Sequence, residues 1–141
     1  MAIVKIIAIR DRLDKRVNYA INGEKTTLDA GITYPVNSEK TKQHFFASAI
    51  NCESCETAYA EMQETKRCFG KAGGVVGYHF IQSFAPGEVT PEQAHRIGMA
   101  FAKKLFGGQY EAVIGTHLDK AHLHNHIVVN SVSFVDGRKY H

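Results

Sequence analysis

Hydrophobic positions recur along the chain with two different periods, and each period predicts a different kind of element. Residues 3–9 (IVKIIAI) are rich in β-branched side chains and predict a strand. Residues 12–22 (RLDKRVNYAIN) instead carry an apolar residue every four positions, at Leu13, Val17 and Ile21. That spacing places the three side chains on one face of a helix, so the chain is expected to begin with a strand followed by an amphipathic helix.

The middle of the chain alternates between irregular and patterned segments. Residues 24–50 are polar and contain several turn formers, although residues 45–50 (FFASAI) are compatible with a short strand. Residues 54–69 show a helical pattern that KAGG at 71–74 ends, and residues 75–84 (VVGYHFIQSF) have the composition of a strand.

A third helix, within PGEVTPEQAHRIGMAFAKKLF, has the clearest start signal in the chain. Thr90 is a good N-cap, Pro91 occupies the first helical position, and Gln93 completes a capping box. Gly107 and Gly108 then end the helix.

Two further strands are predicted at residues 110–118 (YEAVIGTHL) and 122–134 (HLHNHIVVNSVSF), separated by only a few residues. So short a connection favours an antiparallel hairpin over a crossover. The chain therefore predicts one α+β domain over residues 1–141, with helices packed on a mainly antiparallel central sheet.

The composition agrees with a globular domain and excludes several other classes of protein. Hydrophobic residues make up 44% of the 141 positions and charged residues 22%, which excludes a disordered tail. No apolar run approaches the roughly 20 residues of a membrane helix, and the N-terminus lacks the features of a signal peptide. Three cysteines without a secretory signal predict a reducing, cytoplasmic setting, in which CESC at 52–55 is structural or incidental rather than a zinc or redox pair. The net charge of +3 permits nucleic acid as a partner without requiring it.

The stretch THLDKAHLHNHIVVN, at 116–130, concentrates four histidines and an aspartate in ten positions. Alternate side chains of a strand share a face, so one face is expected to carry His122, His124, His126, Val128 and Asn130. The opposite face would carry Leu123, Ile127 and Val129, which suit a core packed against a helix. His117, on the neighbouring strand, can reach the histidine face.

The alternative interpretation of this face is a solvated polar surface. Single histidines elsewhere fit ordinary packing or surface roles, and they are His44, His79, His95 and His141. Clustered imidazoles differ because they repel one another when protonated, and they are tolerated most easily when they stay neutral around a cation. We therefore expect a metal site. Imidazole donors suit zinc, manganese or nickel better than magnesium, and a metal with an open position can activate water or polarise a phosphate oxygen.

The segment HLDKAHLHNHIVVN resembles the histidine motif of conjugative relaxases, the tyrosine HUH endonucleases that nick plasmid or transposon DNA at an origin of transfer. The matching positions are His117, Asp119, His124, His126 and Asn130. RVNYAINGEKT resembles the family's first motif and contains Tyr19, while YHFIQSFAPGE resembles its second and contains Ser83. The similarity is greatest to mobilisation relaxases of Gram-positive integrative or conjugative elements, and it covers the whole chain in order.

The resemblance implies a fold, a reaction and a cofactor. Tyr19 would attack a DNA phosphate and form a 5′-phosphotyrosine, so that the strand can later be rejoined by the reverse attack of a 3′-hydroxyl. His117, His124 and His126 would hold a divalent ion that stabilises the phosphate. The family implies Mn²⁺ or Mg²⁺, whereas donor chemistry alone suggests Zn²⁺, with Ni²⁺ also compatible.

The remaining motif residues receive supporting roles from the resemblance. Asp119 would orient an imidazole or act as a base near Tyr19. The residues expected to orient a ligand or contact DNA are His122 and Asn130. The residues expected to bind the DNA backbone are Ser83, Lys15, Arg16 and Lys25, although solvated surface charge is the ordinary explanation for the three cations.

The chain is thus expected to be a relaxase catalytic domain, the N-terminal part of a longer protein, acting on single-stranded or hairpin origin DNA. Accessory relaxosome proteins and a coupling protein are expected as further partners, and a membrane is not. Two alternatives remain open. One is a phosphodiesterase whose nucleophile is metal-bound water, and the other is a non-catalytic DNA-binding or metal-storage module.

Overall fold

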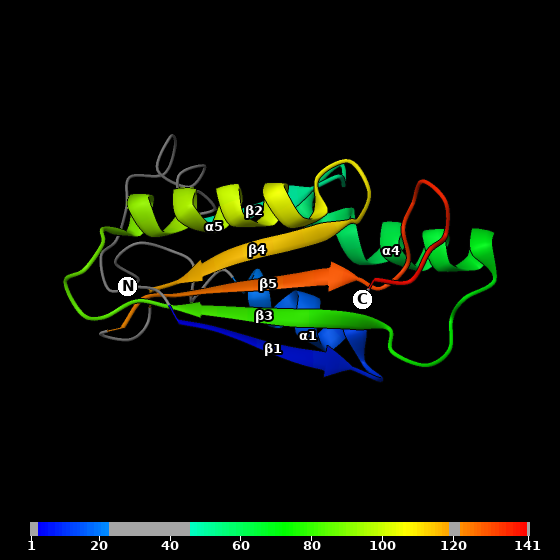
Figure 1. Ribbon diagram of the computed structural model, residues 1–141, viewed down its shortest axis with the longest axis horizontal. Helices are drawn as coiled ribbons and strands as arrows, with labels where there is room; N and C mark the ends of the chain where they lie inside the picture. Colours follow the sequence, from blue (N-terminus) through cyan, green and yellow to red (C-terminus); the bar gives the residue numbers. More distant parts are fainter. Residues whose placement is uncertain (1–2, 23–45, 119–121, 141) are drawn as a thin grey trace, which may run out of the picture.

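An antiparallel sheet with strand order β1-β3-β5-β4-β2 forms the centre of the computed structural model, which describes residues 3–22, 46–118 and 122–140 (Figure 1). The strands are β1 (Ile3–Ile9), β2 (Ala47–Ile50), β3 (Gly77–Ser83), β4 (Ala112–His117) and β5 (His124–Asn130). The helices of the described part are α1 (Leu13–Ala20), α4 (Cys55–Phe69) and α5 (Pro91–Phe106). The predicted α+β class and the predicted hairpin of the last two strands are both confirmed.

The helices cover both faces of the sheet. In Figure 1, α5 runs lengthwise beside β4 and in front of β2, and α1 lies behind the strands. Under α5, Phe106 packs with Ile114 and Ile127, whereas under α1 and α4 the sheet contributes Val113 and Val128. The packing of Val113 and Val128 corrects the expectation of a polar histidine face. The histidine face is not wholly polar, because its far half is buried beneath two amphipathic helices.

Local sequence signals account for the helix ends. The Thr90 side chain accepts from the Gln93 backbone N–H, and the Gln93 side chain accepts from the Thr90 N–H, which confirms the predicted capping box. Ser54 caps α4, and that helix ends at Gly70, whose φ of +63° is left-handed. Its last helical residue is Phe69, which is the predicted end.

The last strand is shorter than predicted. β5 stops at Asn130, and the chain then turns and returns through an isolated bridge between Val132 and Lys139. His122 precedes the strand and is exposed, so it does not share the face of His124 as a strand residue would.

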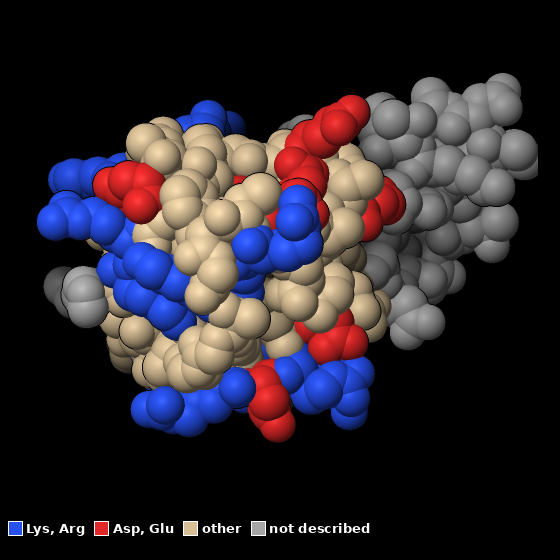
Figure 2. Space-filling model, turned by 90° about the vertical axis from the view of Figure 1, so that its right-hand side faces the viewer, with Lys and Arg blue, Asp and Glu red and all other residues tan. Residues whose placement is uncertain are grey.

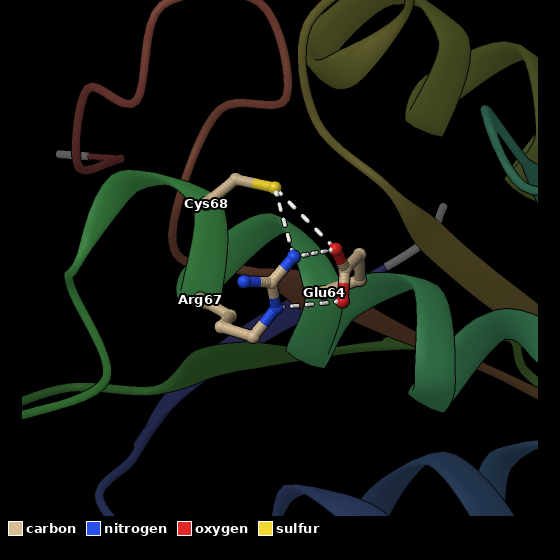
Figure 3. A network of polar contacts seen from close by, with 3 residues as sticks. All are labelled: Glu64, Arg67 and Cys68. Carbon is tan, nitrogen blue, oxygen red and sulfur yellow. Dashed lines mark hydrogen bonds and ion pairs between the residues drawn. The ribbon is translucent and has the colours of Figure 1, made fainter.

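The cysteine positions do not form a reactive pair. Burial raises the pKa of Cys52 to about 12 and that of Cys55 to about 11, so both thiols stay protonated at neutral pH. Cys68 lies on the exposed side of α4 beside an ion pair of Glu64 and Arg67 (Figure 3). Within the part of the chain that the structure describes, no helix is both long and apolar enough to cross a membrane.

Candidate active site

Strand pairing brings the motif histidines together. His117 of β4 lies directly opposite His124 of β5, so the two side chains leave the sheet on the same face. His126 follows on that face, and its ring is stacked on that of His117 with 4.0 Å between centroids. The ring of His124 lies 6.1 Å from that of His126. The pairing therefore gathers all three predicted metal ligands.

Tyr19 comes from the other side of this cluster, on the last turn of α1. Its ring centroid is 4.9 Å from that of His117 and 5.1 Å from that of His126, in edge-to-face geometry. Val17 and Ala20 are buried, while Tyr19 is 40% exposed. Tyr19 therefore lies beside the apolar stripe of the helix and faces the histidine cluster.

His79 is a site residue that the sequence interpretation assigned to ordinary packing. It pairs with Val128 across β3 and β5, which places it on the histidine face. Its Nε2 lies 2.9 Å from Nδ1 of His126, and its Nδ1 lies 3.0 Å from the guanidinium of Arg16. The sequence contains one indication that His79 belongs to the site, because it lies on the same face of its strand as Ser83. Strand parity alone does not show which face of the sheet that is.

The surroundings of His79 keep it neutral. Burial, the charge of Arg16 and the nearby His117 lower its pKa from 6.5 to about 4. A neutral imidazole has one N–H and one lone pair, so it donates at one nitrogen and accepts at the other.

The other motif histidines are held by backbone carbonyls. Nδ1 of His124 donates to the His122 carbonyl at 3.0 Å, and Nε2 of His117 donates to the Ala20 carbonyl at 3.1 Å. The first bond orients the His124 ring with its Nε2 lone pair directed away from the backbone, the usual arrangement of a metal-ligating imidazole. His122 therefore supports His124 through its main chain.

The donor set fits a divalent transition metal. Three imidazoles on adjacent strands are suitable ligands for such an ion. Among the residues that the structure describes, no three His, Cys, Asp or Glu side chains are already arranged as a complete set. Nε2 of His117 is bonded to a carbonyl, and His126 is bonded to His79.

The expected DNA-binding residues are distributed unevenly around this cluster. Ser83 is half-buried and lies opposite His124 on β3, while Lys15 is exposed on α1. Arg16 lies partly buried between α1 and the sheet. Two other candidates, Asp119 and Lys25, lie outside the described residues.

Asn130 lies at the far end of β5 and is fully buried beneath α4. Its amide donates to the Met62 carbonyl at 3.2 Å and to Glu111 at 3.0 Å, and its oxygen accepts from Lys66. This placement does not support the expected contact with DNA or with a metal ligand. The side chain instead joins a helix to the sheet.

Comparisons with known proteins agree with this geometry. The sequence profile described as "Relaxase: MobA/VirD2-like, nuclease domain" matches residues 31–141. A protein named "Protein rlx" from Staphylococcus aureus is 42% identical over 93 residues, covering 66% of this chain and 29% of the relative. The "Group II intron-interrupted relaxase LtrB" of Lactococcus lactis subsp. cremoris is 46% identical over 71 residues, covering 50% of this chain and 13% of the relative. The chain thus spans less than a third of either relative, and no solved structure matches it significantly.

Proposed function

This chain belongs to the MobA/VirD2-like relaxase nuclease domains, and from that membership we propose that it nicks and rejoins one DNA strand at an origin of transfer. The proposed nucleophile is Tyr19. The observation that carries this proposal is the position of the Tyr19 ring, 4.9 Å and 5.1 Å from two histidines of a three-imidazole cluster.

In the proposed reaction, the Tyr19 hydroxyl oxygen attacks the phosphorus, and the bond from phosphorus to the 3′ oxygen breaks. The products are a 5′-phosphotyrosine and a 3′-hydroxyl end. On the basis of the motif, Asp119 is proposed to accept the phenolic proton. A phosphotyrosine retains the energy of the phosphodiester, so a 3′-hydroxyl can reverse the step and reseal the strand.

Relaxases of this family generally use a divalent metal ion. Here His117, His124 and His126 would hold it, with Mn²⁺ or Mg²⁺ as the proposed ion. When bound, the ion supplies charge stabilisation at a non-bridging phosphate oxygen and helps to orient the phosphate. The α1 helix places Tyr19 against the same imidazoles, so this chain brings the nucleophile and the phosphate together by packing.

The proposed DNA substrate is single-stranded or hairpin origin DNA, bound in the cytoplasm. Lys15, Arg16 and Lys25 would bind the backbone, and Ser83 would donate to a phosphate near His124. Accessory relaxosome proteins and a coupling protein are further proposed partners of the complete protein.

The test is incubation of the chain with origin DNA and Mn²⁺, followed by denaturation in SDS and a search for a covalent adduct. Tyr19→Phe is expected to lower the rate of adduct formation by at least roughly 10³-fold, because the nucleophilic oxygen is gone. Tyr59→Phe on α4 is the matched control and should retain the adduct. An adduct that persists in Tyr19→Phe would disprove the assignment of the nucleophile.

The two alternative functions give different results in the same assay. A hydrolase that uses metal-bound water would cleave the DNA over many turnovers without a covalent adduct. A binding or storage module would leave the phosphodiester intact.

A further inference from the structure

Three strands end in one row at the histidine cluster. β3 ends at Ser83, β4 ends at His117 and β5 begins at His124, and these residues lie directly opposite one another in the sheet. The ends of strands are the parts of a sheet that open most readily. A site built on such ends is therefore held more firmly by any further contact that joins the three strands.

A row of buried polar side chains lies one residue further into the same strands, on the opposite face of the sheet. Gln82 of β3, Asn125 of β5 and Thr116 of β4 are direct cross-strand neighbours, and we call them the polar row. The Asn125 amide donates to Oε1 of Gln82 at 2.8 Å, and its oxygen accepts from the Thr116 hydroxyl at 2.6 Å. These bonds join the three strands through side chains, in addition to the backbone ladder.

Helix α5 covers the middle of the polar row. The Asn125 amide also donates to the Ala94 carbonyl at 2.7 Å, so both of its N–H groups and its oxygen have partners, and the residue is fully buried. A Cβ atom at Gly98 would lie only 2.5 Å from the Asn125 amide nitrogen. Glycine is unfavourable in a helix interior, and here it allows the close approach of α5 to Asn125.

The polar row distinguishes the observed strand register from its nearest alternatives. A shift of β5 by two residues keeps each side chain on its own face, so the alternation of faces does not exclude it. On β3 this shift would place Asn125 opposite Phe80 or Phe84. On β4 it would place Asn125 opposite Ile114 or Leu118. The amide would then be buried against apolar side chains without its partners, which is costly.

We propose that Asn125 is a positioning residue for the metal site, which fixes the strand ends that present His117 and His124. A shift by two residues would move His124 by about 7 Å relative to His117, and this would separate two ligands of one ion. His126 follows Asn125 directly and depends on the same stretch of backbone. The inference rests on the proposed function, because it takes the three histidines as metal ligands.

The experiment compares Asn125→Ala with Asn130→Ala in the full chain. Each substitution removes a fully buried asparagine of β5, but Asn130 lies at the other end of the strand and bonds to α4. Calorimetry measures Mn²⁺ affinity without DNA, at a temperature where urea unfolding shows both variants to be folded. Asn125→Ala should weaken Mn²⁺ binding about tenfold, as substitutions that disturb the orientation of metal ligands do. Asn130→Ala should keep the wild-type affinity.

A second readout needs no metal. Without Mn²⁺, amide hydrogens of residues 124–126 should exchange faster in Asn125→Ala than in the wild type, while those of residues 128–130 stay unchanged. Asn130→Ala should give the reverse pattern. Gln82→Met is the further variant if Asn125→Ala does not fold, because it removes one partner of Asn125 and keeps a side chain of similar size. It should weaken Mn²⁺ binding about threefold.

Wild-type Mn²⁺ affinity in Asn125→Ala, or in Gln82→Met where that variant replaces it, would overturn the inference. An equal loss of affinity in the two asparagine variants would also overturn it, because the effect would then be general destabilisation. A wild type that forms the Tyr19-dependent adduct, together with normal Mn²⁺ binding in Asn125→Ala, would reject the positioning role alone. A wild type that binds no Mn²⁺ would instead reject the proposed metal site.

Discussion

His95 shows how a single buried histidine can serve stability without belonging to the site. It is a residue of α5 and faces the sheet on the side opposite the histidine cluster, between Ser48 and Thr116. The Thr116 hydroxyl donates to Asn125, so it accepts from Nδ1 of His95, whose Nε2 must accept from Ser48. The neutral form fits these partners, and burial lowers the pKa of His95 from 6.5 to about 4.

The pH dependence of folding follows from that shift. The contribution of His95 is complete above pH 6.5 and is lost as the pH falls toward 4, because only the unfolded chain takes up a proton in that range. The full loss is on the order of 3 kcal/mol of unfolding free energy. Urea unfolding of the wild type and of His95→Gln between pH 7 and pH 4 tests this. The variant should show a shallower pH dependence, and parallel curves would contradict the prediction.

Individual residues also show which features of the site could be predicted from the sequence and which could not. The resemblance to relaxase motifs pointed to Tyr19 and the motif histidines, and strand parity predicted that His124 and His126 share a face of the sheet. The role of His79 could not be predicted, because it depends on the pairing of His79 with Val128, a contact between strands distant in sequence. Asn130 matched a motif, yet its burial beneath α4 is a property of the packed fold.

At the scale of elements, a set of buried polar side chains joins α4 to β5, the central strand of the sheet. Asn130 links Lys66 and the Met62 carbonyl of the helix to Glu111, which precedes β4 and also accepts from Thr65. Burial lowers the pKa of Lys66 to about 8 and raises that of Glu111, so both groups depend on their partners.

Asn130→Ala should therefore destabilise the fold by about 2 to 4 kcal/mol, because it leaves buried donors and acceptors without partners. Chemical denaturation measures the change, with exposed Asn18→Ala on α1 as the control that should stay within about 0.5 kcal/mol of the wild type. At a temperature where the variant is folded, its affinity for origin DNA should equal that of the wild type. Weaker DNA binding with unchanged stability would restore a functional role for Asn130.

The type of each described element, helix or strand, was predicted correctly, whereas the bounds of several elements were not. Hydrophobic period and capping residues identified β1 and all three described helices, since these signals are local. The strand order, with β5 between β3 and β4, depends on long-range pairing and was not predicted. The overextension of the last strand to residue 134 has a similar cause, because the chain turns after Asn130 and Val132 pairs with Lys139, a contact that the local pattern does not reveal.

At the scale of the whole molecule, positive charge is unevenly distributed. Figure 2 shows lysines and arginines gathered over the end of the molecule where α4 finishes and the chain approaches its C-terminus. A hollow there is lined partly by Lys71, Arg138 and Lys139. Lys71 and Lys139 donate to backbone carbonyls nearby, which holds these two charges at the hollow.

This charge should attract DNA over a distance. Reversing the exposed Arg138 with Arg138→Glu is expected to weaken DNA association several-fold at low salt and to have little effect at about 0.5 M salt, where exposed charges are screened. The adduct yield at saturating DNA should not change. Fluorescence anisotropy across a salt series measures this, and an equal loss at every salt concentration would indicate direct contact instead.

The central position of β5 has a consequence for how the two halves of the site move. His124 and His126 are on a strand bonded to a neighbour along each edge, whereas Tyr19 is on an eight-residue helix anchored by three buried side chains. Amide hydrogens of such a central strand exchange with solvent only when most of the fold opens, while the end of a short helix opens locally and often. The imidazoles are therefore the fixed half of the site. The tyrosine belongs to the half that can withdraw, and in the proposed reaction it would carry the covalently attached DNA strand with it.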